Sequence, residues 1–202
     1  MRIVFLGPPG SGKGTQSSRL SKKFGIPQLS TGDIFRTEVG KNTDIGQQIK
    51  SMMETGRLIS DSIVNKVVYN RIRYSSDCAH GFILDGYPRT VDQARFLQHF
   101  LSNLGFCIDA VIELSVDDVA MFKRIDDRIS RSMSSKESIR SDDKHDVLLK
   151  RIEDYREKIC LLSEYYRDIG CLYTVDGMLD VETVSKYIDS VLVAVEKKCC
   201  NS

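Results

Sequence analysis

The fold of this chain is decided by the stretch Gly7-Pro8-Pro9-Gly10-Ser11-Gly12-Lys13 and by what stands on either side of it. The stretch follows the apolar run at residues 2–6 (RIVFL), which predicts a buried strand, and it opens a helical pattern over residues 13–24. Between a strand and a helix, glycines let backbone N–H groups turn inward around phosphate oxygens, and the helix N-terminus adds the positive end of its dipole. Lys13 contributes a mobile positive charge. The sequence therefore predicts a phosphate-binding loop of the Walker A type.

Short apolar runs alternate with helical patterns along the rest of the chain. Further strands are predicted over residues 27–29, 81–84, 110–114 and 172–175. Helices are predicted over residues 13–24, 32–39, 45–55, 62–74, 91–103, 116–129, 142–168 and 181–197. Strands separated by helices are typical of a parallel sheet. We therefore expect an α/β fold with a five-stranded parallel sheet flanked by helices.

The composition narrows the class of function. The 29 Lys and Arg residues nearly balance the 28 Asp and Glu residues, so we expect no nucleic-acid partner and no acidic membrane surface. No apolar run approaches the roughly 20 residues that a membrane helix needs. The six cysteines contain no C-x-x-C pair and none lies near a histidine at metal-ligand spacing, which favours reduced thiols in a cytoplasmic protein. A redox role for Cys199 and Cys200 stays open as the alternative.

A carboxylate ends the third predicted strand, at Asp85. Because the carboxyl ends of parallel strands meet at one edge of a sheet, we expect Asp85 beside the phosphate loop. Gly14 stands where a Ser or Thr ordinarily ligates Mg²⁺, with Thr15 one residue later. The loop is therefore not expected to ligate the metal directly, and Asp85 is the candidate to orient Mg²⁺ through water. A turn or capping role for Asp85 before Gly86 is the alternative.

Three ordered motifs carry a resemblance to a known family. Residues 7–16 (GPPGSGKGTQ), 30–36 (STGDIFR) and 85–90 (DGYPRT) resemble the adenylate kinase family, and the likeness continues at residues 124–128, 140–143, 150–152 and 175–177. The resemblance covers essentially the whole chain. It implies a three-layer P-loop NTPase core made of residues 1–29, 60–128 and 141–202. It also implies an AMP-binding helical insertion over residues 30–59 and a short lid over residues 129–140.

The resemblance also implies an activity and a set of site residues. The activity is reversible transfer of the γ-phosphoryl group of Mg·ATP to AMP, giving two ADP, by a monomeric enzyme of nucleotide biosynthesis. ATP would be bound by Gly10, Ser11, Gly12, Lys13, Gly14, Thr15, Arg124 and Gly177. AMP would be bound by Thr31, Arg36, Arg57, Leu58, Ile59, Gly86, Arg89, Gln93, Arg140 and Arg151. The catalytic set would be Lys13, Asp85, Arg89, Arg124, Arg128, Arg140 and Arg151.

This large number of Lys and Arg residues is consistent with phosphoryl transfer. A loose transition state spreads negative charge over the equatorial oxygens, and guanidinium groups can form paired hydrogen bonds to those oxygens. Arg124 and Arg128 are four residues apart on a predicted helix and so share one face, although a solvated basic face paired with the neighbouring acids is the alternative. Eleven residues separate Arg128 from Arg140, and none is Cys or His. We therefore expect a short lid without structural zinc. Ile129 and Asp127 depart from the family pattern beside Arg128.

Two other interpretations differ in what the protein binds. A UMP/CMP kinase would share the fold, the loop and the arginines, but Thr31 and Gln93 favour adenine. From spacing alone, Gln93 also fits a T-x-x-Q capping box begun by Thr90, so its contact with the base rests on the resemblance. An ATP-binding switch protein would leave Arg36 and Arg89 unexplained.

Overall fold

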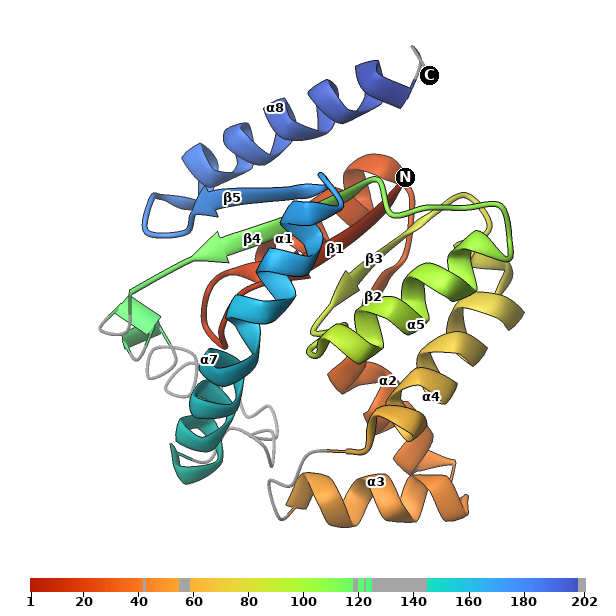
Figure 1. Ribbon diagram of the computed structural model, residues 1–202. Coiled ribbons are helices and arrows are strands. Elements are labelled where there is room, and N and C mark those ends of the chain that lie inside the picture. The colour runs from red at the N-terminus through yellow and green to blue at the C-terminus, as the bar shows by residue number, and fades with distance from the viewer. Residues whose placement is uncertain (42, 55–58, 118–119, 122, 125–144, 200–202) are drawn as a thin grey trace.

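The chain folds into a fully parallel, five-stranded sheet between two layers of helices (Figure 1). The computed structural model describes all residues except 42, 55–58, 118–119, 122, 125–144 and 200–202. The strands lie in the order β2-β3-β1-β4-β5. They are β1 (Arg2–Leu6), β2 (Gln28–Ser30), β3 (Phe82–Asp85), β4 (Ala110–Ser115) and β5 (Leu172–Asp176).

Helices lie between successive strands, and α8 follows the last strand. They are α1 (Lys13–Phe24), α2 (Thr31–Gly40), α3 (Asp44–Glu54), α4 (Asp61–Tyr74), α5 (Val91–Ser102), α7 (His145–Asp168) and α8 (Val181–Cys199), with a short 3₁₀ turn at Ser76–Cys78. The strand predictions agree with the structure to within one residue at each end, and the α/β class with a five-stranded parallel sheet is confirmed. The helix predicted over residues 116–129 falls mostly outside the described residues.

Alternation along β1 decides which helices cover which face of the sheet. Val4 and Leu6 point into a cluster with apolar residues of α4, α5 and α7, whereas Ile3 and Phe5 point into a second cluster with α1 and α8. Side chains i and i+2 of a strand lie on the same face, so a central strand buried on both faces reads as a continuous apolar run. The run at residues 2–6 is such a strand.

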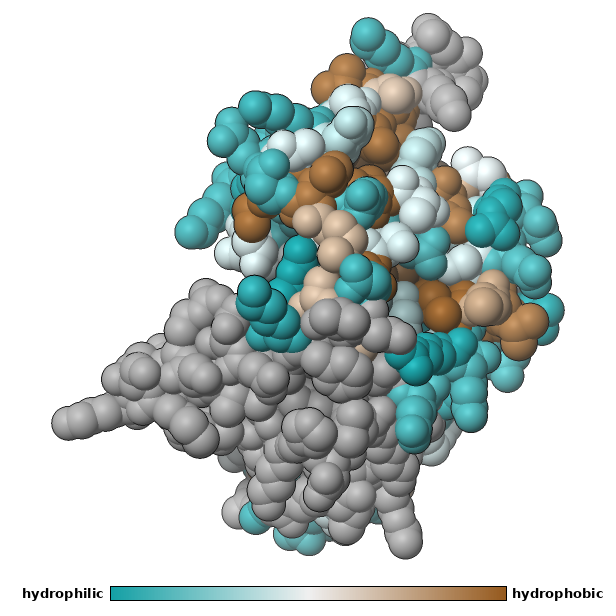
Figure 2. Space-filling view, turned by 90° about the vertical axis from the view of Figure 1, so that its left-hand side faces the viewer, coloured by the Kyte–Doolittle hydropathy of each residue, from teal (hydrophilic) through white to brown (hydrophobic). Residues whose placement is uncertain are grey.

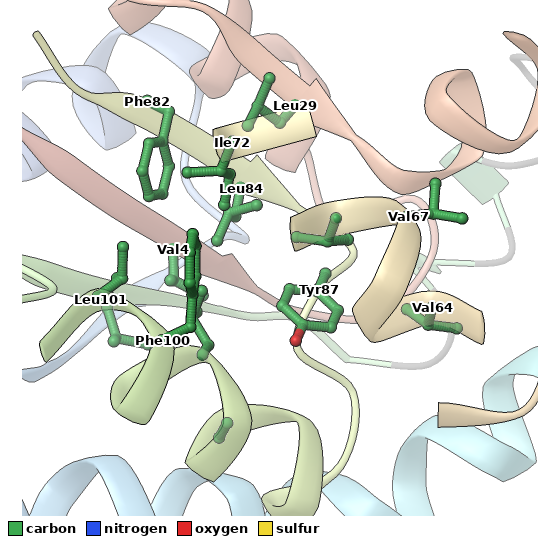
Figure 3. Packing of buried hydrophobic residues seen from close by; sticks show 14 of the residues in the cluster. Val4, Leu29, Val64, Val67, Ile72, Phe82, Leu84, Tyr87, Phe100 and Leu101 are labelled. Carbon is green, nitrogen blue, oxygen red and sulfur yellow. The ribbon is translucent and has the colours of Figure 1, made fainter. Parts of the chain in front are cut away.

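The first cluster extends beyond the sheet. Figure 3 shows Tyr87, Val64 and Val67 packed where α4 meets the chain after β3, next to the layer formed by Val4, Phe82 and Leu84. Phe35 of α2 and Ile49 of α3 are buried in the same cluster. The helices of residues 31–54 are therefore packed on the core at the β2 side of the sheet (Figure 1).

Within the described residues, no helix is long and apolar enough to span a membrane. The coloured surface in Figure 2 carries hydrophobic residues interspersed with hydrophilic ones. Predicted site residues lie at the carboxyl ends of the strands. Each strand ends there beside a segment that the sequence singled out, and the parallel arrangement brings these segments to one edge of the sheet.

Candidate nucleotide site

The loop between β1 and α1 is bonded to its own lysine. Lys13 Nζ donates to the carbonyl oxygens of Gly7 at 2.7 Å and Pro8 at 2.8 Å. Gly12 precedes the helix with a left-handed backbone (φ 97°), which glycine adopts at little cost, and α1 begins at Lys13 without a side-chain cap. The first N–H groups of α1 therefore have no side-chain cap, as in helix N-termini that bind phosphate.

Asp85 lies beside this loop, as predicted from its place at the end of β3. Oδ2 of Asp85 would lie only 3.7 Å from a Cβ atom built on Gly14, so the carboxylate faces the first turn of α1. Gln28 Nε2 of β2 donates to the same oxygen at 3.4 Å. Gly14 and Thr15 are exposed on that turn. The structure thus places one carboxylate within reach of a cation held at the loop, and Gly14 offers no hydroxyl to compete with it.

Gly86 is the meeting point of two residues predicted to bind the monophosphate. Its carbonyl oxygen accepts hydrogen bonds from Thr31 Oγ1 at 3.2 Å and from Arg89 Nε at 2.8 Å. Gly86 has φ +81°, and a Cβ atom there would approach Thr31 Oγ1 to 2.8 Å and Arg89 Nη2 to 3.2 Å. Only glycine leaves room for this close approach. Thr31, which begins α2, is buried by the same contact.

Arg36 lies one turn further along α2. Its Nη2 atom forms an ion pair with Asp33 Oδ1 at 2.5 Å, and its guanidinium group packs against Gly32. The pairing holds the side chain against the first turn of α2.

Gln93 is a buried amide whose two polar atoms bond to the protein. Its Oε1 atom accepts from the backbone N–H of Arg89 at 2.7 Å, and its Nε2 atom donates to Asp61 Oδ1 at 2.6 Å. Thr90 Oγ1 accepts from the Gln93 N–H at 3.2 Å, which is the threonine half of a capping box. The glutamine half differs from that motif, because the side chain bonds back to Arg89 rather than to Thr90. The local capping interpretation therefore accounts for part of the geometry.

The segments after β4 and β5 close the other side of the loop. Arg124 Nη2 donates to Gly177 O at 2.8 Å, and the Gly177 N–H donates to Ser115 O at 2.8 Å. Gly177 is buried against the loop, since a Cβ atom there would lie 3.4 Å from Ser11 O. The predicted ATP-side residues Arg124 and Gly177 are thus brought together with the phosphate loop.

Some predicted site residues cannot be placed. Arg57, Leu58, Arg128 and Arg140 lie outside the described residues, as do the predicted lid and the unusual pair Asp127 and Ile129. Arg151 is on α7, but its side chain is outside the described part of the structure. Ile59 is described, and it packs against the first apolar cluster.

The structure also shows residues that sequence reasoning missed. Asp61 accepts from Gln93 and Thr90, and Tyr87 donates to Asn65 Oδ1 at 2.7 Å, so two residues of α4 are bonded to the segment after β3. Burial, reinforced by the charge of Asp61, raises the pKa of Tyr87, so its hydroxyl stays protonated and remains a donor. Asn65 and Asp61 precede Tyr87 and Gln93 by 22 and 32 residues, so no local pattern marks these contacts.

Comparison with known proteins gives one consistent result. The family model described as "Adenylate kinase" matches residues 5–171. Proteins named adenylate kinase from Rhizobium meliloti (strain 1021) and Agrobacterium fabrum are each 50% identical over 192 residues, which is 95% of this chain and 100% and 97% of theirs. The protein of that name from Brucella ovis is 50% identical over 193 residues, covering 96% of this chain and 99% of its own. Because the family model matches residues 5–171 and these relatives are 50% identical over 95–96% of this chain, the chain belongs to the adenylate kinase family.

Proposed function

We propose that this protein transfers the γ-phosphoryl group of Mg·ATP directly to AMP at the carboxyl edge of its sheet, giving two ADP. The observation that carries the proposal is that two elements predicted to bind phosphate lie at the carboxyl ends of neighbouring strands. The loop with Lys13 follows β1, and Gly86 and Arg89 follow β3, which pairs with β1. Thr31 follows β2, which pairs with β3, and bonds to Gly86. ATP and AMP are the substrates and ADP is the product of this reaction.

Each nucleotide has its own set of residues in the proposal. The loop amides and Lys13 hold the ATP phosphates, and Arg124 with Gly177 lies beside them. Arg36 and Arg89 hold the AMP phosphate, because paired guanidinium groups match phosphate oxygens. Arg128, Arg140 and Arg151, together with Arg57, Leu58 and Ile59, belong to the proposed site through the family resemblance. The catalytic contribution of all these cations is electrostatic stabilisation of the group in flight.

The chain supplies no general base in this proposal, and none is required. The AMP phosphate has a second pKa near 6 and is already largely dianionic at neutral pH. Positioning the two phosphates in line then does most of the work. Asp85 beside Gly14 fits a Mg²⁺ ion that is held by ATP and oriented through water. When bound, the ion neutralises charge on the β- and γ-phosphates.

We further propose that residues 30–59 and 129–140 move over AMP and ATP on the core of residues 1–29, 60–128 and 141–202, since exposed γ-phosphoryl groups would hydrolyse. We also propose a cytoplasmic monomer that binds no nucleic acid and holds no structural zinc. Within the described residues, no group of three or more His, Cys, Asp or Glu side chains is placed to hold a metal.

The test is a coupled assay of ADP formation by the purified protein with Mg·ATP and AMP, CMP, UMP or GMP in turn. We expect product with AMP and at most a small fraction of that rate with CMP or UMP. EDTA should stop the reaction without lowering the melting temperature, because the metal acts with ATP and not in the fold. Equal use of UMP or CMP would contradict the adenylate assignment, and tightly bound stoichiometric zinc would contradict the proposed metal dependence.

A further inference from the structure

Each carboxylate oxygen of Asp61 accepts a hydrogen bond from a residue of the segment after β3. It is the first residue of α4, two residues after the end of the segment proposed to bind AMP. Asp61 Oδ1 accepts from Gln93 Nε2 at 2.6 Å, and Asp61 Oδ2 accepts from Thr90 Oγ1 at 2.7 Å. Gln93 is only 4% exposed, so its amide has little water to bond with instead. One carboxylate therefore fixes a buried amide that none of the sequence motifs connects with it.

The chemistry of the two partners fixes which way round the amide lies. A carboxylate accepts hydrogen bonds and does not donate them, whereas the backbone N–H of Arg89 only donates. The Nε2 group of Gln93 must therefore face Asp61, and Oε1 must face Arg89, as the structure shows. If the amide were turned over, its oxygen would face the Asp61 carboxylate and its NH₂ group would face the Arg89 N–H. Two acceptors would then meet at Asp61 and two donors at Arg89, and leaving buried polar groups unpaired in this way is costly.

The orientation decides what the amide can offer a ligand. An amide oxygen has two lone pairs and an amide nitrogen has two hydrogens. One of each is used by the protein partners that the structure describes, which leaves Gln93 one acceptor position and one donor position in a fixed order. A base that presents a donor beside an acceptor in the complementary order will bind, and a base with the opposite order leaves buried polar groups unpaired.

We propose that Asp61 is a positioning residue that sets the choice of nucleobase, because it fixes the donor and acceptor order of Gln93. The inference rests on the proposed function, in which Gln93 faces the adenine of AMP. Asp61 itself touches no substrate in this proposal. Its second bond, to Thr90, ties α4 to the start of α5 and involves neither polar atom of the Gln93 side chain.

A merely structural role and a positioning role predict different results. If Asp61 only joins α4 to α5, its loss lowers the melting temperature and affects all monophosphates alike. If it orients Gln93, its loss lowers selectivity, measured as the ratio of kcat/KM for AMP to kcat/KM for CMP. The KM for ATP should not change, since the hydrogen bonds that join Asp61 and the Gln93 side chain run to each other, to Thr90 and to Arg89.

The experiment compares four variants with the wild type. Asp61→Ala should lower the AMP/CMP selectivity about tenfold, mainly by raising the KM for AMP, on the scale of one misplaced buried hydrogen-bonding group. Asp61→Asn keeps an acceptor for Gln93 Nε2 and should retain most of the selectivity. Thr90→Val removes the bond to Asp61 and the cap on the Gln93 backbone N–H, but it leaves the Gln93 side chain bonded to Asp61 and Arg89, so it should lower the melting temperature without changing selectivity. Asp92→Ala, which removes an exposed acid on the first turn of α5, is the matched control and should change neither.

A second readout does not depend on activity. The side-chain NH₂ signals of Gln93, assigned by their loss in Gln93→Leu, should shift in ¹⁵N-labelled Asp61→Ala and stay in place in Thr90→Val. Should Asp61→Ala not fold, Asp61→Ser serves in both measurements, because its short hydroxyl does not replace the carboxylate. Unchanged selectivity with an unshifted amide would overturn the proposal. Failure of the proposed function is separate, since it appears as wild-type protein that does not prefer AMP.

Discussion

The phosphate loop and the segment after β3 lie at the carboxyl ends of paired strands, but they are built differently. The loop is shaped by its own backbone, and its lysine bonds to carbonyl oxygens five and six residues away. The segment of residues 86–93 is held by side chains from other helices, with Thr31 from α2 and Asp61 from α4. The bonds of Lys13 within the loop are local in sequence, whereas the segment of residues 86–93 is held by residues distant in the chain.

This difference separates general binding from discrimination. A loop of inward-facing amides and one cation recognises phosphate, which all nucleotides share. Side chains with a fixed donor and acceptor order recognise one base among several. Changes in the loop should therefore reduce activity toward every monophosphate, and changes around Gln93 should alter which monophosphate is used.

The largest effect is expected at the loop. Lys13→Ala should leave a folded protein whose phosphoryl transfer is roughly 10²-fold slower or worse, because a preorganised charge at developing oxyanions is worth a few kcal/mol. The loss should be the same fraction with AMP and with CMP. Steady-state kinetics with both acceptors test this, and Lys22→Ala on the last turn of α1 is the matched control. An unchanged rate in Lys13→Ala would remove the lysine from the site.

Gln93→Leu, in the segment of residues 86–93, should change the choice of monophosphate rather than the overall rate of transfer. We expect the AMP/CMP selectivity to fall about 10- to 100-fold, on the scale of one or two unpaired buried polar groups at roughly 1–3 kcal/mol each. The free energy of unfolding should also fall by about 1–3 kcal/mol, because Asp61 Oδ1 and the Arg89 N–H lose a buried partner. Kinetics and urea unfolding measure the two effects. Lost stability with intact selectivity would leave Gln93 with its capping role alone.

Gly86→Ala should give a smaller, AMP-specific defect. The added methyl group would meet Thr31 Oγ1 at 2.8 Å, so that contact or the neighbouring Arg89 must shift. Weakening one hydrogen bond of about 1 kcal/mol corresponds to a KM for AMP raised roughly fivefold, with little change in the KM for ATP. Gly105→Ala is the control, because Gly105 also has positive φ (+73°) but nothing lies within 4 Å of the new methyl group. Equal kinetic effects in the two variants would assign the defect to backbone strain.

The smallest effect on stability is expected between α1 and α8. Asp189 of α8 forms ion pairs with Arg19 and Lys23 of α1 at 2.9 Å each. Partial burial disfavours the charge, but hydrogen bonds from Lys23 and Arg19 outweigh it and lower the pKa of Asp189. The ion pair therefore stabilises the fold above the pKa of Asp189 in the unfolded chain, about 4. This stabilisation is lost as the pH falls through the lower pKa of Asp189 in the folded protein. Asp189→Asn should cost at most about 1 kcal/mol at neutral pH, with activity unchanged.

Thermal unfolding of wild type and Asp189→Asn at several pH values checks this, with Glu196→Gln on the same helix as the control. The difference between wild type and Asp189→Asn should shrink below about pH 4. A difference that grows on acidification would mean that the ion pair does not stabilise α1 against α8.

The sequence predicted most of the fold, because strands buried on both faces and amphipathic helices have distinct periods. It also predicted Asp85 beside the loop of Lys13, since both lie at the carboxyl ends of parallel strands. It could not predict the strand order or the role of Asp61, because both depend on which distant segments pack together. The side-chain contacts of Arg128, Arg140 and Arg151 remain predictions from the family resemblance.

The junction between β2 and α2 has no loop, because the strand ends at Ser30 and the helix begins at Thr31. An inserted residue would therefore turn α2 by about 100° and translate it by about 1.5 Å, since nothing in between absorbs the change. Thr31 would then leave Gly86, and Arg36 would leave the face it now occupies. In cells whose growth depends on this enzyme, insertions at this junction should not be tolerated, whereas insertions at the exposed turn around Gly105 should be. The number of residues between β2 and α2 is therefore as constrained as their identity.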